Sequence, residues 1–459
     1  MKIIVLNGSP KGDTSVTIHS VKYLQKKFPS HEFEILNIAK RIKGIERRQA
    51  TFDGIIAEIA AADGVLWAFP LYLLLVPARL KRFIELIYER GAQAAFAGKY
   101  TAAISTSIHF CDHIAHRYIQ GICDDLDMKF TASFSADMMD LIDERERARL
   151  TQFGGFFLEA IQHQHPSLKR FQPLEWQDFN YQPGEGLHSI EVGDKKVLVI
   201  TDAHPEDNNL RRMVDRFRTS FVSDIEVANL NDLKIVSSCI GCLQCGYDNE
   251  CAFSGRDDYN AFYRDKVLKA DVLIFAGRMT DRHLSALWKT YFDRSFFMGH
   301  FPSLIGKQLG FIISGPLSSN ENLREFFESY AGWQHVNIIG FVTDELENSQ
   351  EIDLQLQELA RRGIEFARSG YVQPATFLGV GAHKVFRDDV WGRLRTVFQA
   401  DHRAYKESGW YDFPMWDVPT HLMAAMGSVG MNIPVIREQI QEMLQHGVSF
   451  RHRKIVEKA

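Results

Sequence analysis

Apolar runs and helical patterns alternate along the first half of the chain. Unbroken apolar runs are typical of strands that are buried on both faces of a parallel sheet. A helical pattern ends near Lys26, and another covers 77–91 and closes on a glycine. The predicted strands lie at 2–8, 32–38, 63–70, 101–108 and 128–136. This alternation predicts an α/β fold with a doubly wound parallel sheet.

The second half of the chain repeats this order of apolar and polar positions. Residues 195–210 align with 1–16 at an offset of 194, and residues 270–277 align with 62–69 at an offset of 208. The second half therefore carries extra residues between its second and third strands. An internal duplication explains the agreement, so we expect two tandem domains of the same fold.

The boundaries of these domains follow from changes in composition. We expect the first domain at 1–180 and the second at 194–370, joined near 182–186, a stretch rich in glycine and proline. Residues 371–459 are dense in Trp, Phe, Met and His and do not repeat the pattern. We interpret them as a helical extension packed on the two domains.

Two clusters in this extension combine charged and aromatic residues. They are Phe386-Arg387-Asp388-Asp389 and Asp401-His402-Arg403, and their composition favours core or interface packing over catalysis. The extension ends on a basic stretch, 451–458, which is typical of a solvated tail.

Composition excludes several classes of protein. The chain of 459 residues is 45% hydrophobic and 24% charged, with a net charge of −5, so no basic nucleic-acid footprint is present. No segment has the roughly 20 apolar residues that span a bilayer, and the first residues run into a strand without a cleavage site. We therefore expect a cytoplasmic protein with no membrane or nucleic-acid partner. In a reducing cytosol, clustered cysteines favour a metal site over disulfides.

The loop GSPKGDTS (8–15) lies between the first predicted strand and a helix. Backbone N–H groups of such a loop converge at the positive end of the helix, where a phosphate binds well. A plain turn capped by an acidic or hydroxyl side chain is the alternative. The candidate phosphate-binding residues are Ser9, Lys11, Asp13, Thr14 and Ser15.

This loop resembles the opening of the NADPH-dependent FMN reductases, which have a flavodoxin-like fold. Their second signature follows the third strand and is similar here to Pro70-Leu71-Tyr72 and Pro77-Ala78-Arg79-Leu80-Lys81. Leucines at 73–75 replace the small residues that are common in that turn. A third loop follows the fourth strand. The resemblance places these two loops beside the flavin ring, with candidate contacts from Pro70, Leu71, Tyr72, Leu73, Thr106, Ser107 and His109.

The second half lacks the flavin loops. Asp202-Ala203-His204 replaces the Gly-Ser-Pro of the first loop, and Arg278-Met279-Thr280 replaces Pro-Leu-Tyr. A carboxylate at 202 would repel a phosphate, so we expect no FMN in the second domain.

Four of the six cysteines lie in CIGCLQCGYDNEC, with the spacing C-x2-C-x2-C-x5-C. Three explanations remain open: a [4Fe–4S] cluster, a tetrahedral zinc ion, or a remnant without metal. The loop, followed by Asp257-Asp258, resembles that of the iron–sulfur flavoproteins, whose dimers place the FMN of one subunit near the cluster of the other. The candidate metal ligands are Cys239, Cys242, Cys245 and Cys251.

These resemblances imply an FMN-dependent NAD(P)H oxidoreductase in which the two domains form a pseudo-dimer. FMN on the first domain would face a cluster on the second and reduce a small acceptor such as a quinone, nitro or azo compound. Because the flavin carries the redox chemistry, we predict no catalytic side chain. The alternatives are an electron carrier between ferredoxin-like partners and a non-enzymatic flavin protein with structural zinc. A homo-oligomer remains open, and the extension has two candidate roles, a cover over the flavin or an oligomer interface.

The stretch 108–123 is predicted to form a helix that carries three histidines and two cysteines. His109 and His113 would then share a face, with His116 nearby, so a second metal site is conceivable. A helix surface or the rim of the flavin pocket is the favoured interpretation.

Overall fold

The first domain is built on a parallel five-stranded sheet in the order β2-β1-β3-β4-β5. This is the strand order of flavodoxin-like folds, so the predicted fold is confirmed here. The computed structural model describes residues 1–186 and 188–439, and the basic end at 451–458 lies outside these residues. The strands are β1 (Lys2–Asn7), β2 (Glu32–Leu36), β3 (Gly64–Pro70), β4 (Tyr100–Ser107) and β5 (Lys129–Asp137).

Helices cover both faces of this sheet. The first and last helices of the domain, α1 and α6, pack together on one face, and the remaining helices lie on the other. Ile3 and Val5 of β1 point into the core under α1, where Ile18 and Val21 are fully buried. The helices are α1 (Val16–Lys27), α2 (Ile38–Arg47), α3 (Gln49–Ala61), α4 (Ala78–Glu89), α5 (Asp112–Asp125) and α6 (Glu144–Gln162).

The second domain repeats the first. Its sheet has the order β7-β6-β8-β9-β10, the same order when the strands are counted within the domain. The increase of the alignment offset from 194 to 208 predicts extra residues in the second domain. They lie between β7 and β8, in the segment that includes all four clustered cysteines. The strands are β6 (Val197–Thr201), β7 (Glu226–Asn229), β8 (Val272–Arg278), β9 (Gln308–Ser314) and β10 (Asn337–Thr343).

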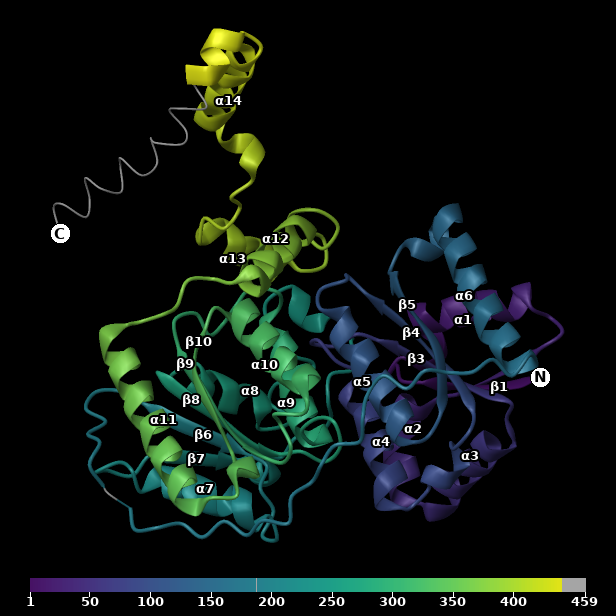
Figure 1. The fold of residues 1–459 in the computed structure, drawn as a ribbon, viewed down its shortest axis with the longest axis horizontal. Helices are drawn as coiled ribbons and strands as arrows, with labels where there is room; N and C mark the ends of the chain where they lie inside the picture. The colour runs from purple at the N-terminus through teal and green to yellow at the C-terminus, as the bar shows by residue number, and fades with distance from the viewer. Residues whose placement is uncertain (187, 440–459) are drawn as a thin grey trace. The chain divides into compact units, whose positions relative to one another are not determined.

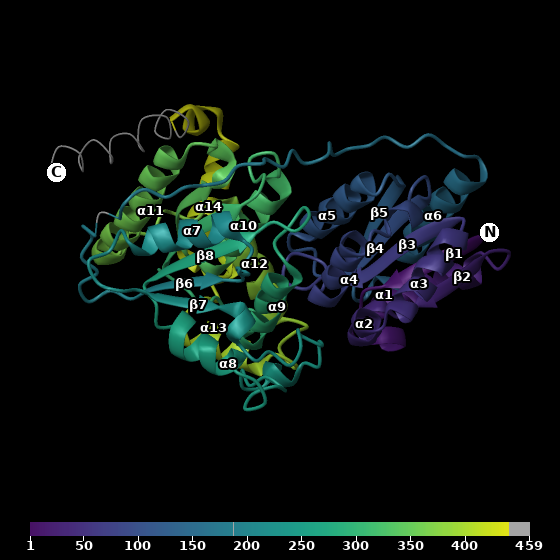
Figure 2. The ribbon, with the colours of Figure 1, turned by 90° about the horizontal axis from the view of Figure 1, so that it is seen from below.

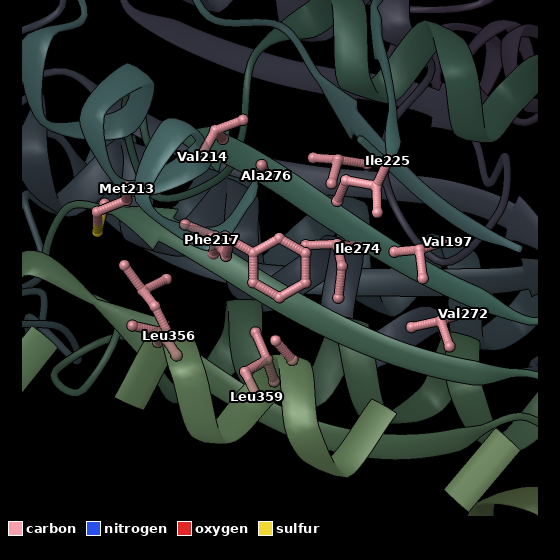
Figure 3. Close-up of a cluster of buried hydrophobic side chains, with 14 of the residues drawn as sticks. Val197, Met213, Val214, Phe217, Ile225, Val272, Ile274, Ala276, Leu356 and Leu359 are labelled. Carbon is pink, nitrogen blue, oxygen red and sulfur yellow. The ribbon is translucent and has the colours of Figure 1, made fainter. Parts of the chain in front are cut away.

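The helices of the second domain also lie on both faces of its sheet. Figure 3 shows the core between the sheet and helices α7 and α11, where Phe217 and Ile274 are fully buried beside Leu356 and Leu359. The helices are α7 (Asn208–Arg218), α8 (Tyr259–Phe262), α9 (Ala286–Ser295), α10 (Glu321–Gln334) and α11 (Ser349–Ser369).

The two domains meet through equivalent helices. Helix α4 packs on α9 and α5 packs on α10, and both views place these helices between the two sheets (Figures 1 and 2). The N–H of Ala78, which begins α4, donates to Asp293 of α9 at 2.8 Å. The N–H of Ala286, which begins α9, donates to Glu85 of α4 at 2.7 Å. The two contacts are reciprocal, as in the interface of a two-fold symmetric dimer.

A buried lysine reinforces each of these contacts. Lys81 donates to Glu85 on its own helix and to Asp281 of the second domain, at 2.8 and 3.1 Å. Lys289, the equivalent residue of α9, pairs with Asp293 and donates to the carbonyl of Tyr72 at 2.6 Å. Both lysines are fully buried, so their charges depend on these partners.

A long connection joins the two domains. No helix or regular strand occurs between His163 and Lys196 among the described residues. Tyr181, in the middle of this connection, is fully buried, and its hydroxyl donates to Asp353 of α11.

The C-terminal region is helical, as predicted. It contains α12 (Phe377–Trp391), α13 (Gln399–Glu407) and α14 (Val418–Met431). The described residues up to 402 form one compact unit that includes both sheets and α12, and the described residues from 403 to 439 belong to a second unit. No helix among the described residues is long and apolar enough to cross a membrane.

Candidate functional site

A cavity of about 300 Å³ lies at the carboxyl ends of the strands of the first sheet. This volume is at the lower end of the range for small-molecule sites. Most residues predicted to contact FMN line it; Asp13 and His109 do not. The predicted residues that line the cavity are Ser9, Lys11, Thr14, Ser15, Pro70, Leu71, Tyr72, Leu73, Thr106 and Ser107.

The loop at 8–15 wraps tightly before α1 begins. Asn7 Oδ1 accepts the N–H of Ser9 at 2.9 Å, and Ser9 Oγ accepts the N–H of Lys11 at 3.3 Å. Gly12 has a φ of +62°, and a Cβ there would lie 2.7 Å from the Lys40 side chain, so glycine is required. Asp13 is exposed and accepts a hydrogen bond from Asn37 instead of facing the cavity.

The loop after β3 contains a tight two-residue turn. Tyr72 and Leu75 exchange backbone hydrogen bonds at 3.0 and 3.2 Å. Leu73 and Leu74 between them have φ values of +38° and +68°. Such turns favour Asn and Gly, and the left-handed region costs other residues about 1 kcal/mol or more. The turn therefore holds two leucine side chains against the cavity at a cost in backbone strain.

The loop after β4 differs from the sequence prediction. The predicted helix over 108–123 is wrong at its start, because α5 begins at Asp112 and both His109 and Cys111 have left-handed backbones, with φ values of +62° and +52°. His109 is thus not on the helix, does not share a face with His113, and pairs with Asp112 at 3.0 Å. His116 is buried and hydrogen-bonds Ser105 at 2.8 Å.

The other wall of the cavity comes from the second domain and α12. Cys239, Gly241 and Leu243 of the cysteine loop lie on it, as does the buried Asp293. The remainder is largely aromatic. The lining residues from this side with rings are Phe296, His300, Trp333, Phe386 and Phe398. The cavity is therefore completed only by both halves of the chain.

The cysteine loop touches the flavin loops directly. A Cβ on Gly241 would lie 2.2 Å from the Tyr72 hydroxyl oxygen and 3.2 Å from Lys11 Cε, so only glycine allows this approach. Gly246 allows the loop to approach the segment after α12, because a Cβ there would lie 2.4 Å from the carbonyl oxygen of Val397. Both glycines thus serve close contact with neighbouring segments.

The four clustered cysteines line a second, small cavity together. Cys239 borders both cavities, so the two sites share a wall. Burial raises the pKa values of Cys239 and Cys245 to about 12, so these thiols are protonated at neutral pH without a cation. Cys242, by contrast, is exposed.

The small cavity has a volume of about 20 Å³, close to that of a single water site. No group of three or more His, Cys, Asp or Glu side chains among residues 1–186 and 188–439 has the arrangement of a metal site. Four thiols border one space, and thiolates are the ligands of iron–sulfur clusters, but these thiols do not converge on one metal position and a four-iron cube would require the loop to open.

A buried ion pair fixes the base of the cysteine loop. Arg294 at the end of α9 pairs with Asp257 at 2.6 Å and donates to the Ser237 carbonyl at 2.9 Å. Asp257 also accepts the N–H of Val236, and Asp258 accepts the N–H of Lys234. The two aspartates that follow the cysteines in the sequence therefore clamp the two ends of the loop together.

The equivalent of the phosphate loop in the second domain is closed by its own side chains. Asp202 is buried and accepts a hydrogen bond from Ser285. Burial raises the pKa of its carboxyl to about 6. Asp207 accepts the N–H of His204 at 2.7 Å and pairs with Arg278 at 2.9 Å. A buried carboxylate thus stands where the first domain has Gly8.

The sequence pointed to the cysteine loop as the element that faces the first domain, but it gave no other residue of the second wall a part in the cavity. Asp293, Phe296, His300 and Trp333 are not part of any local motif, and only the folded chain brings them to the flavin loops. The one available signal was the aromatic density of the extension, which contributes Phe386 and its neighbours to the cavity.

Comparisons with known proteins agree with the first-domain loops. Residues 1–119 match the model of a family described as NADPH-dependent FMN reductase, and no curated protein matches the chain. The apo form of NADH:FMN oxidoreductase (EMOB) is 18% identical over 34% of this chain and 89% of its own, with a TM-score of 0.30. FerB, an NAD(P)H:(acceptor) oxidoreductase from Paracoccus denitrificans, is 20% identical over 35% and 97%, with a TM-score of 0.29. An FMN-dependent NADH-azoreductase from Bacillus anthracis is 16% identical over 36% and 98%, with a TM-score of 0.27. The first domain, over residues 1–119, thus matches the NADPH-dependent FMN reductase family.

Proposed function

We propose that the protein is a cytoplasmic FMN-dependent NAD(P)H oxidoreductase that reduces a small acceptor. The observation that supports this proposal most is the cavity of about 300 Å³ at the carboxyl ends of the first sheet. It is lined by all three loops that resemble the flavin loops of the matched family. When bound there, FMN supplies the transfer of reducing equivalents from nicotinamide to acceptor.

Within this cavity the residues divide into two groups. Ser9, Thr14 and Ser15 carry hydroxyls at the start of α1, and Lys11 adds a positive charge, so this end suits the phosphate. Tyr72, Leu73 and the loop after β4 would flank the ring. Because burial strongly raises the pKa of Tyr72, its phenol stays neutral and donates hydrogen bonds at physiological pH.

An anaerobic absorbance experiment tests the proposal. We expect the purified or FMN-reconstituted protein to show flavin bands that NADPH or NADH bleaches within seconds, faster than either bleaches free FMN. A protein that binds FMN but is not bleached by either nucleotide would instead support the alternative of an electron carrier that receives electrons from a ferredoxin-like partner. A protein that does not retain FMN contradicts the proposal.

We propose as a second function that the cysteine loop holds a [4Fe–4S] cluster that exchanges electrons with the flavin site. The supporting observation is that Cys239 borders both the flavin cavity and the cavity of the four cysteines. Gly241 also brings the loop into contact with Tyr72. A cluster there would supply one-electron transfer close to the flavin.

Metal analysis after anaerobic purification tests this second function. Four iron and four sulfide per chain, lost in a Cys242→Ala variant, are expected. Cys111→Ala is the matched control, because Cys111 lies in the first domain, directly before α5, and is not part of the cysteine loop. Stoichiometric zinc, or neither metal, contradicts the cluster while leaving the flavin function intact.

A further inference from the structure

A histidine–aspartate pair stands on the wall opposite the flavin loops. His300 Nδ1 lies 2.8 Å from Asp401 Oδ2, and the same carboxylate accepts the His300 backbone N–H at 2.9 Å. Both residues are buried, with 7% and 1% of their surface exposed. A carboxylate at Nδ1 fixes the tautomer and orientation of the ring and makes Nε2 the nitrogen that exchanges protons with a ligand.

The backbone around this pair is shaped to receive the carboxylate. Gly299, directly before the histidine, has a φ of +76°. A Cβ on this glycine would lie 1.8 Å from Asp401 Oδ1, so any other residue would displace the aspartate. The turn after α9 and the first turn of α13 are therefore built for this contact.

Aromatic rings surround the histidine and define the shape of the space it faces. Its ring centroid lies 4.5 Å from that of Phe398 and 5.0 Å from that of Phe296, both edge-on. Phe386 lies 5.3 Å away and 5.9 Å from Trp333. All of these side chains line the flavin cavity. Such a wall favours a flat aromatic ligand over a charged or extended one.

We propose that His300 is the proton donor for a quinone acceptor bound between this aromatic wall and the flavin loops, and that Asp401 positions its ring. This inference rests on the proposed function and names its substrate class. Quinone reduction adds a hydride equivalent, supplied by the bound cofactor, and one further proton. The hydride leaves an electron pair on the second oxygen, and that oxygen takes the Nε2 proton of a His300 ring that carries protons on both nitrogens. The ring is left as the Nδ1–H tautomer held by Asp401, and it regains the Nε2 proton from the solvent. The products are hydroquinone and oxidised cofactor.

The test compares an acceptor that needs protons with one that does not. The FMN-loaded protein is reduced with NADPH and reoxidised by 1,4-benzoquinone or by ferricyanide, which takes electrons alone. We expect His300→Gln to lower the ratio of the quinone rate to the ferricyanide rate about 100-fold. Asp401→Asn should lower it about 10-fold. His163→Gln, at the end of α6, is the matched control and should leave the ratio unchanged.

A readout without turnover tests the positioning role of the aspartate. In the flavin-free protein, nitrogen-15 NMR of the histidine rings, with the His300 signals identified by their loss in His300→Gln, should show that the neutral ring carries its single proton on Nδ1. Asp401→Asn should remove this tautomer preference.

Three outcomes overturn the proposal: an unchanged ratio in His300→Gln, a parallel fall of both rates, or a tautomer that does not depend on Asp401. Failure of the proposed function is distinct, since it appears in the wild-type protein as absent flavin binding or absent reduction by NADPH.

Discussion

The two domains share strand order and contact geometry but differ at the loop after the first strand. In the first domain Ser9 lines the cavity, and Gly8 packs closely against Leu80 and Phe69, where a Cβ would lie 2.5 and 3.0 Å from their side chains. In the second, Asp202 fills the equivalent position and is buried against Ser285. The contact between the domains, in contrast, stayed reciprocal, with Ala78 to Asp293 matched by Ala286 to Glu85. The second half thus shares the reciprocal contact with the first, while its loop after the first strand is closed by a buried carboxylate.

This difference shows which constraints act on each half. A phosphate site needs a tight turn and converging N–H groups, and one side chain abolishes it. An interface between two domains depends on many residues that are buried together. It therefore persists when one of the domains no longer binds a ligand. Each prediction below tests one part of this contrast.

The largest effect is expected at the buried lysines of the interface. Lys81→Met leaves Asp281 buried without its cation and Glu85 with Arg82 as its remaining cation, so it should lower the free energy of unfolding by about 3–5 kcal/mol in urea denaturation. Lys289→Met leaves a single carboxylate, that of Asp293, and should cost less.

The control for this prediction is an exposed pair of the same spacing. Lys269→Met removes the pair with Asp265, where both side chains are more than half exposed, and should change the free energy of unfolding by less than about 0.5 kcal/mol. Equal, small losses at all three lysines would show that the reciprocal contact does not hold the domains together.

An intermediate effect is expected at Asp202, with a dependence on pH. Burial raises its pKa to about 6 in the folded protein, above the usual value of about 4 in an unfolded chain. The folded state therefore loses stability as this carboxyl ionises between about pH 4 and pH 6. In Asp202→Asn this loss is absent, so its stability relative to wild type should rise by about 2 kcal/mol from pH 4 to pH 7.

Asp224→Asn is the matched control, because that side chain of the same domain is 95% exposed. Urea unfolding at several pH values measures both variants. If the difference in the free energy of unfolding between Asp202→Asn and wild type does not change with pH, the prediction of a raised pKa for the buried Asp202 carboxyl is wrong.

The smallest effect is expected at the phosphate loop. Ser9→Ala gives the first domain the residue that the second already has, Ala203. Loss of one hydrogen bond to a charged group should weaken FMN binding about ten-fold, or about 1.4 kcal/mol. Fluorescence titration measures this, with riboflavin as the control ligand because it lacks the phosphate. An equal loss of affinity for both ligands would place Ser9 away from the phosphate.

The sequence predicted the two sheets because unbroken apolar runs and glycine-rich turns are local signals. It also predicted that three loops share one site, since each lies directly after a strand, and these loops line one cavity. The start of α5 was mispredicted because Cys111 and His109 adopt left-handed backbones that helical periodicity does not reveal. Pairing of His300 with Asp401, 101 positions apart, depends on tertiary packing alone, and no local pattern encodes it.

The covalent connection between His163 and Lys196 has a consequence for how the cavity behaves on dilution. Where two walls of a site belong to separate subunits, the complete site disappears below the dissociation constant of the dimer. Here the linker keeps both walls at a high effective concentration, whatever the amount of protein present. One polypeptide also fixes their stoichiometry at one to one, so each half is free to specialise without the risk of pairing with a copy of itself.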